Sequence, residues 1–175
     1  MDLCWPLPAF LEHVPAQLAS IEEAMSVVLD LVDRNVEEGG GPFAALIVDG
    51  QGRVLGAGCN RVLPAACSVL HAEMVAIMSA QARLNSHDLR PWGAHLLSSC
   101  EPCAMCLGAL PWAGIVDLSY AASAAAAESI GFDEGAKPQP WQRGLQERGI
   151  AVHPPLQTAR ACAQLQAYGR LQRLY

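Results

Sequence analysis

The chain has 175 residues, of which 52% are hydrophobic and 16% charged, and its formal net charge is −6. This composition predicts one globular domain, residues 1–175, with a sizeable core, and it argues against intrinsic disorder. The 11 Lys and Arg residues are scattered, so nucleic acid is not an expected partner. No apolar run reaches the roughly 18 residues of a membrane helix, and the acidic start does not resemble a signal peptide, so we expect a cytoplasmic protein without membrane contact.

The first half of the chain alternates between helical and extended patterns. Ser20 and Glu23 have capping-box spacing, and apolar residues follow at helical intervals, which predicts a helix from residue 21 to the glycine run at 39–41. Residues 43–48 and 53–57 flank a turn at 49–52, which predicts a hairpin. We further predict a helix over 70–84, a strand over 94–98, a helix over 103–112 and a strand over 115–120.

The last third is less regular. The alanine-rich stretch 121–130 is predicted to be helical by propensity, and residues 131–144 are predicted to be irregular. A short strand at 150–152 and a helix over 158–168 complete the order. Strands that alternate with helices predict a three-layer α/β/α sandwich around a mixed five-stranded sheet.

Two short segments carry the chemistry. The first contains His71 and Glu73, and the second contains Cys103 and Cys106. Zinc prefers thiolate and imidazole ligands, and two cysteines in the first turn of a helix can reach one ion, where the positive helix end favours thiolates. Three ligands from the protein would leave a fourth position for water, whose pKa the ion lowers towards about 7. Glu73 is suited to act as the general base.

The alternative is a structural zinc site without catalysis. Each segment alone is weak evidence, but the order H-x-E and then P-C-x-x-C is the pattern of zinc deaminases that act on bases. Cys100 could nevertheless supply a fourth ligand and close the site. Two arguments oppose a closed site. Pro102 is expected to turn Cys100 towards the end of its strand, and Glu73 would have no task in a site without bound water. Because the seven cysteines are an odd number, a disulfide framework is not expected.

The motifs resemble the cytidine deaminase superfamily and, within it, the bacterial guanine deaminases. The resemblance lies in residues 41–43, 59–62, 71–73, 103–109, 112 and 131–134, and the last of these segments distinguishes the guanine deaminases best. It implies the cytidine deaminase-like fold, a bound Zn²⁺, and hydrolysis of guanine to xanthine and ammonia. Two other kinds of substrate stay open, namely another free base, such as cytosine, or an aminated triazine, such as ammeline.

The resemblance also implies roles for individual residues. Phe43 would pack on the purine, Asn60 would hydrogen-bond its N7 or O6, the backbone around Ala72 would add a further hydrogen bond, and Trp112 would line the pocket. Glu134 would relay a proton to the departing amine. By themselves, the two aromatic residues could be ordinary core residues, Asn60 could cap a turn, and Glu134 could be a solvated carboxylate.

The resemblance further implies a homodimer. Its C-terminal tail, about residues 156–175, would be exchanged onto the partner subunit, and Tyr168 or Tyr175 would close the active site there. A frayed chain end is the alternative for this tail.

Overall fold

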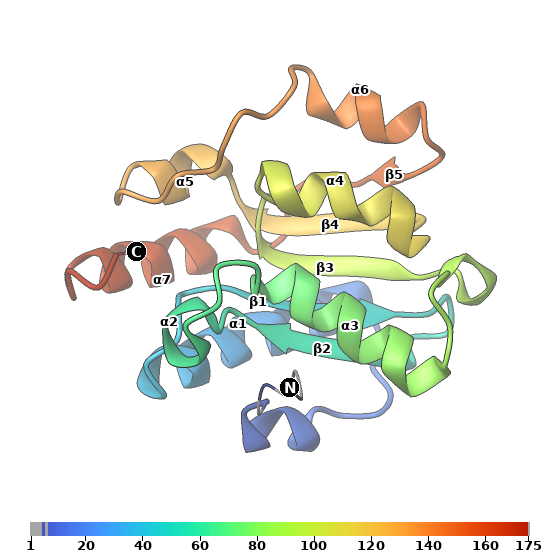
Figure 1. Ribbon diagram of the computed structural model, residues 1–175, viewed down its shortest axis with the longest axis horizontal. Coiled ribbons are helices and arrows are strands. Elements are labelled where there is room, and N and C mark those ends of the chain that lie inside the picture. The colour runs from blue at the N-terminus through green and yellow to red at the C-terminus, as the bar shows by residue number, and fades with distance from the viewer. Residues whose placement is uncertain (1–4, 6, 175) are drawn as a thin grey trace.

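The computed structural model describes residue 5 and residues 7–174, and it contains a five-stranded sheet between two layers of helices (Figure 1). The strands lie in the order β2-β1-β3-β4-β5. Strand β1 is antiparallel to β2 and β3, whereas β3, β4 and β5 run parallel. Their bounds are Ala44–Val48 for β1, Val54–Cys59 for β2, His95–Cys100 for β3, Asp117–Ala122 for β4 and Ala151–Val152 for β5. The predicted mixed sheet is therefore confirmed.

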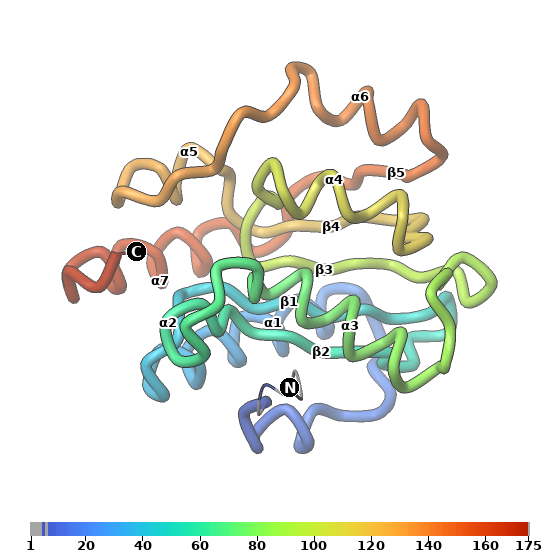
Figure 2. The backbone as a smooth tube through the Cα atoms, in the orientation of Figure 1, coloured from blue at the N-terminus to red at the C-terminus, as the bar shows by residue number. Residues whose placement is uncertain are grey.

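Helices cover both faces of this sheet. Helices α1 (Ile21–Glu37) and α7 (Thr158–Gly169) lie on one side, and α3 (Ala72–Leu84) and α4 (Ala104–Ala113) lie on the other (Figures 1 and 2). The shorter helices are η1 (Ala9–His13), α2 (Val62–Ala65), η2 (Arg90–Trp92), α5 (Ala124–Glu128) and α6 (Trp141–Gln146). The predicted three-layer sandwich is confirmed. Among the described residues, no helix is both long and apolar enough to cross a membrane.

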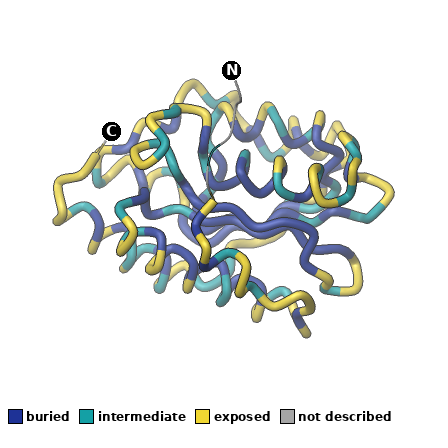
Figure 3. Tube along the Cα trace, turned by 60° about the horizontal axis from the view of Figure 1, so that its bottom comes forward, coloured by how far each residue is buried: buried dark blue, intermediate teal, exposed yellow. Residues whose placement is uncertain are grey.

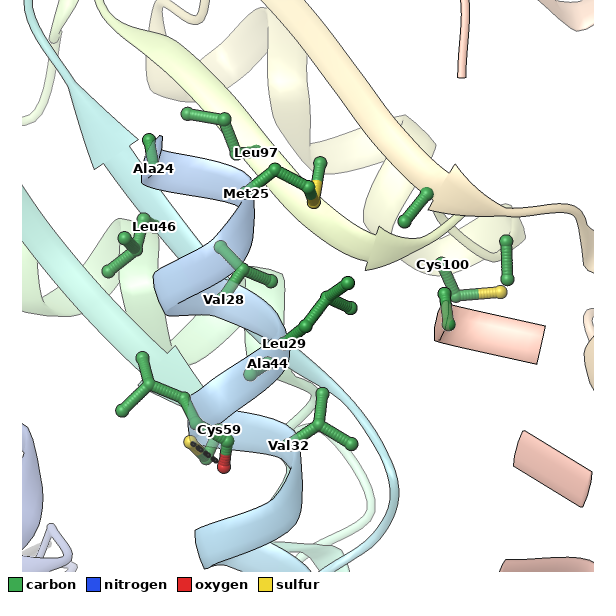
Figure 4. Packing of buried hydrophobic residues seen from close by; sticks show 14 of the residues in the cluster. Ala24, Met25, Val28, Leu29, Val32, Ala44, Leu46, Cys59, Leu97 and Cys100 are labelled. Atoms are coloured by element: carbon green, nitrogen blue, oxygen red, sulfur yellow. Dashed lines mark hydrogen bonds between the residues drawn. The ribbon is translucent and has the colours of Figure 1, made fainter. Parts of the chain in front are cut away.

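The two cores lie on opposite faces of the sheet. Along β1, Leu46 and Val48 join the cluster under α1, and Ile47 joins the cluster under α3, as the alternation of side chains in a strand requires. Because both faces are covered, β1 is buried throughout, and the sheet lies in the buried centre of the molecule (Figure 3). Figure 4 shows the α1 side, where Met25 and Val28 project from the helix towards the sheet.

Helix α1 begins as its sequence predicts. The Ser20 hydroxyl accepts a hydrogen bond from the Glu23 amide at 3.1 Å, and the Glu23 carboxylate accepts one from the Ala19 amide at 2.6 Å. These bonds satisfy N–H groups that have no partner inside the helix. The cap fixes the start of α1, whose far end reaches the candidate site.

Helix α3 packs unusually close to strand β2 because that strand contains Gly56 and Gly58. A Cβ added at Gly58 would lie 2.3 Å from both the Ala72 carbonyl oxygen and the Ala76 amide nitrogen. Real Cβ atoms do not approach other atoms so closely, so only glycine permits this contact. The contact holds the first turn of α3 against the sheet, and this turn carries His71 and Glu73.

Two predictions about the last third are wrong. Residues 121 and 122 belong to β4, because that strand pairs with β3 as far as Cys100 and Ala122, and sheet pairing overrides the helix propensity of alanine. The helix there is only α5, which Ser123 caps. The stretch 131–144 is not wholly irregular either: α6 begins at Trp141, whose buried ring contacts Tyr120 with centroids 5.9 Å apart.

Candidate active site

Three side chains converge where the first turns of α3 and α4 meet. Cys103 Sγ lies 3.4 Å from His71 Nδ1, and Cys106 Sγ lies 3.8 Å from the same nitrogen. The three ligand atoms lie within 4.8 Å of one another. One imidazole and two thiols form a donor set that suits zinc, so the residues present fit this ion. The trio predicted from the sequence is thus brought together.

The local fold explains this convergence. His71 and Cys103 are the N-cap residues of α3 and α4, and Cys106 lies in the first turn of α4. A hydrogen bond from the Cys106 thiol, followed by the one from His71, lowers the pKa of the Cys103 thiol to about 4. The thiolate of Cys103 in turn raises the pKa of His71. The pair thus places the negative charge on Cys103, whereas the hydrogen bond to Cys103 and burial raise the pKa of Cys106, so a bound metal ion would have to displace the Cys106 proton.

Cys100 does not join this trio. Its Sγ lies 3.5 Å from the carbonyl oxygen of Ser123, to which the thiol donates, and the side chain packs into the core under α1 (Figure 4). Burial raises the pKa of this thiol well above its ordinary value. Three ligands from the protein, rather than four, therefore surround the candidate metal position.

Glu73 lies beside the trio and is buried. Its Oε1 accepts a hydrogen bond from Ser98 at 3.2 Å, and its Oε2 accepts one from Cys106 at 3.4 Å. Burial raises the pKa of this carboxyl above its ordinary value, which suits a group that must both take up and release a proton. Sequence reasoning did not identify Ser98, which reaches Glu73 from strand β3.

A cavity of about 310 Å³ opens in front of Glu73. This volume is at the small end of the range for ligand pockets and suits a flat, single base. Twelve residues line it: Phe43, Asn60, Val62, Ser68, His71, Glu73, Cys100, Glu101, Cys103, Phe132, Asp133 and Glu134. The predicted residues Phe43, Asn60, Glu73 and Glu134 therefore share one cavity with two of the candidate metal ligands, His71 and Cys103.

Asn60 is buried at the cavity wall and its amide has a defined orientation. Its Oδ1 accepts a hydrogen bond from the Val62 amide at 3.2 Å, which leaves Nδ2 to donate into the cavity. The backbone carbonyl of Asn60 is held by the fully buried Asn35, whose Nδ2 donates to it at 2.9 Å and to the Gly41 carbonyl at 2.8 Å. Arg61 completes the network by donating to Asn35 Oδ1 at 3.0 Å.

Two aromatic rings, of Phe43 and Phe132, form another part of the wall, and the ring of Tyr168 lies behind them. Phe43 and Phe132 meet edge to face with centroids 4.9 Å apart, and Phe132 stacks on Tyr168 at 5.9 Å. The Tyr168 hydroxyl donates to the Arg173 carbonyl. Tyr168 is therefore buried behind Phe132 and does not line the cavity as a lid. Tyr175, the other predicted lid, lies outside the described residues.

Glu134 lies at the cavity with two charged neighbours. Its Oε2 accepts a hydrogen bond from Lys137 at 3.2 Å, and the same ammonium donates to Glu101 Oε1 at 2.8 Å. Burial raises the pKa of Glu134 to about 7, although Lys137 opposes this shift. Sequence reasoning did not identify Lys137, because the residues it joins are far apart in the chain and form no motif.

Trp112 requires a correction. Its side chain is 83% exposed, and it is absent from the cavity lining of this chain. Trp112 follows the buried Cys106 by six residues on α4, about 240° around the helix, so the two face different sides. Ala72 is fully buried between His71 and Glu73 in the first turn of α3 and is absent from the cavity lining, so a hydrogen bond from its backbone to the substrate stays a prediction.

Comparison with known proteins agrees with this geometry. Residues 18–122 match the family described as the cytidine and deoxycytidylate deaminase zinc-binding region. The chain belongs to this deaminase family. Its members bind zinc, and the His71, Cys103 and Cys106 trio provides the matching site. The chain is therefore a zinc-dependent hydrolytic deaminase.

Relatives within the family differ in what they act on. Guanine deaminase from Bacillus subtilis is 38% identical over 114 residues, which are 65% of this chain and 71% of that protein. A tRNA-specific adenosine deaminase from Haemophilus influenzae is 29% identical over 58% of each chain. The structure of a guanine deaminase from Nitrosomonas europaea superimposes with a TM-score of 0.93 at 43% identity, covering 97% of both chains. A similar structure, of NE0047, contains 2,6-diaminopurine.

Proposed function

We propose that this deaminase converts guanine to xanthine and ammonia. The orientation of Asn60 carries the proposal, because its Nδ2 offers a hydrogen-bond donor to the cavity. Guanine presents two acceptors, O6 and N7, on one edge, whereas adenine presents a donor at the position of O6. With guanine held by that edge, its 2-amino group lies at the far side of the ring. The names of the Bacillus and Nitrosomonas relatives support the same substrate.

The side chains then divide the proton transfers. Zinc, when bound, supplies a Lewis acid that lowers the pKa of water. Glu73, oriented by Ser98, removes the proton of the attacking water and delivers it to N3 of guanine, which makes C2 electrophilic. After water has added to C2, Glu134 protonates the amine, which leaves as ammonia. The pKa of Glu134, about 7, suits a group that donates a proton near neutral pH.

A homodimer is part of the proposal. Met105 and Trp112 are both exposed on α4, and an exposed tryptophan beside apolar residues is typical of a protein interface. Within this chain, however, α7 packs on its own α1, where Gln164 donates to the Leu29 carbonyl at 2.7 Å. Exchange of residues 156–175 between subunits therefore stays a prediction. We also expect a cytoplasmic enzyme of purine catabolism.

A substrate panel tests the proposal. The zinc-loaded protein is assayed for ammonia release from guanine, cytosine, ammeline, adenine, adenosine and tRNA. We expect guanine to give the highest kcat/KM. A higher kcat/KM for cytosine or ammeline would refute guanine as the preferred substrate and assign the faster base instead.

The Glu73→Gln variant tests the mechanism with the same assay. It should keep its zinc and lose about 10²–10⁴-fold in kcat, the usual contribution of a general acid–base group. Arg143→Met is the control. Arg143 is an exposed residue of α6 and, among the described residues, it forms an ion pair only with the exposed Glu147. A Glu73→Gln variant with the wild-type rate would contradict the assigned proton transfers.

A further inference from the structure

Lys137 is the buried cation of the candidate site. Its side chain is 6% exposed, and its ammonium donates three hydrogen bonds: to Glu101 Oε1 at 2.8 Å, to the Pro102 carbonyl at 3.2 Å and to Glu134 Oε2 at 3.2 Å. An ammonium has three N–H groups, so all of its donors are used. Burial alone would lower the pKa of Lys137, but the bond to Glu101 and the charge of Glu134 raise it. Lys137 is therefore a fixed positive charge.

This arrangement separates Lys137 from the substrate. Lys137 does not line the cavity, whereas Glu101 and Glu134 do. With every donor engaged by the protein, the ammonium has none left for a ligand. Any effect of Lys137 on the reaction must therefore pass through the groups that it holds, namely the two carboxylates and the Pro102 carbonyl, and the zinc content reports on the last of these because Pro102 precedes Cys103.

Glu134 is fixed at two points. Its backbone carbonyl accepts a hydrogen bond from the Ala104 amide at 2.9 Å, which ties it to the first turn of α4. Its side chain is tied through Oε2 to Lys137, so Oε1 is the oxygen left for the cavity. Without the ammonium, the segment around residue 134 would keep its backbone contact, but its carboxylate would be free to rotate and would lie unpaired beside Glu101.

We infer that Lys137 is a positioning residue for the deamination, which holds the Glu134 carboxylate with one oxygen towards the substrate. This inference rests on the proposed function of Glu134 as the group that protonates the leaving amine. Lys137 thus orients an acid–base group without contacting the reacting atoms, much as buried partners orient catalytic groups elsewhere. It also balances the negative charge of two neighbouring buried carboxylates.

A double-mutant cycle tests the inference. Wild-type protein, Lys137→Met, Glu134→Gln and the double variant are loaded with zinc and assayed with guanine, with kcat expressed per zinc-loaded site. We expect Lys137→Met to lower kcat by about tenfold or more, within the range of acid–base catalysis, and to leave KM and zinc content nearly unchanged. In the Glu134→Gln background, the same change should cost less than about twofold, because coupled residues are not additive. Arg143→Met serves as the control and should match the wild type.

Chemical rescue keeps the test decisive if Lys137→Met folds poorly. Lys137→Arg retains the positive charge and should retain more activity than Lys137→Met. Lys137→Ala should regain kcat in a saturable way when ethylammonium is added, and the rescue should be absent when Glu134 is also replaced by Gln. A purely structural role predicts neither pattern.

The outcomes separate this inference from the proposed substrate. Wild-type kcat for Lys137→Met, or losses that multiply in the double variant, would overturn the positioning role. For a Lys137→Met protein that does not fold, failure of the amine to rescue Lys137→Ala would overturn it. Inactivity of the wild type on guanine would instead refute the proposed substrate, and the same variants would then be assayed with whichever base is turned over.

Discussion

Replacing Asn35 by Asp should damage the fold and the substrate site together. Asn35 is fully buried, and its Nδ2 donates to the carbonyl oxygens of Gly41 at 2.8 Å and of Asn60 at 2.9 Å. Aspartate has nearly the same shape, but it places an oxygen where this donor stands. The Asn60 carbonyl then loses its partner, the Gly41 carbonyl keeps only its bond from the Phe43 amide, and both face a negative charge. The bond from Arg61 is kept and gains charge assistance, which offsets part of the loss.

The size of the effect follows from these contacts. A buried polar group that loses its partner costs about 1–3 kcal/mol of unfolding free energy, which applies to the Asn60 carbonyl, and repulsion of both carbonyls by the new carboxylate adds to this cost. A domain of this size is stable by about 5–15 kcal/mol, so Asn35→Asp should still fold under mild conditions. Since Asn35 also holds the backbone of Asn60, we expect kcat/KM for guanine to fall by at least about tenfold, because small displacements of binding groups reduce rates strongly.

Urea unfolding and steady-state kinetics measure the two effects. Asn85→Asp is the matched control, because it makes the same chemical change at an exposed residue; since Asn85 is the C-cap of α3, its new charge should cost about 0.3–1 kcal/mol and leave kcat/KM unchanged. An Asn35→Asp protein with the stability and kcat/KM of the wild type would show that the Asn35 network does not hold the site. A loss of stability without a change in kcat/KM would restrict its role to folding.

Three further predictions concern single sites. Gly58→Ala should cost about 1–3 kcal/mol of unfolding free energy and lower activity, because its Cβ would overlap the Ala72 carbonyl of α3, whereas Gly144→Ala, with open space around it, should be neutral or stabilising. Cys100→Ala should keep one zinc per chain in metal analysis, and its cobalt derivative should show two thiolate ligands, as in the wild type; loss of the metal would make Cys100 a ligand after all. Glu134→Gln should retain zinc and remove the fall in kcat that occurs as pH rises through about 7, where Glu134 loses its proton.

Local patterns in the sequence are sufficient to predict several elements of the fold and the candidate metal ligands. The cap of α1 and the hairpin are encoded within a few residues, and they were predicted correctly. The ligand trio was also predictable, because zinc chemistry restricts both the residue types and their spacing. The helix predicted over residues 121–130 is wrong at its start, because the local preference of alanine for a helix is overridden where residues 121 and 122 belong to the strand that pairs with β3.

Other features depend on contacts between distant segments. Glu134 is only three residues from Lys137, but Glu101 is 36 residues away and reaches Lys137 only after the chain has folded, so no spacing rule indicates the three-residue cluster. Trp112 lies on the helix that carries the metal ligands, but the direction of its side chain follows from the rotation of α4 rather than from its nearness to Cys106. The thiol of Cys100 likewise finds its partner, Ser123, just beyond the end of the neighbouring strand β4.

The aromatic wall of the cavity has a consequence for how the enzyme matures during its synthesis. Phe132 needs Tyr168 from α7 behind it, so the wall is complete only when nearly the whole chain has left the ribosome. All three ligands of the zinc site are present once Cys106 has emerged. We therefore expect nascent chains to bind metal before they can bind substrate, so that the ion is in place when the last helix docks.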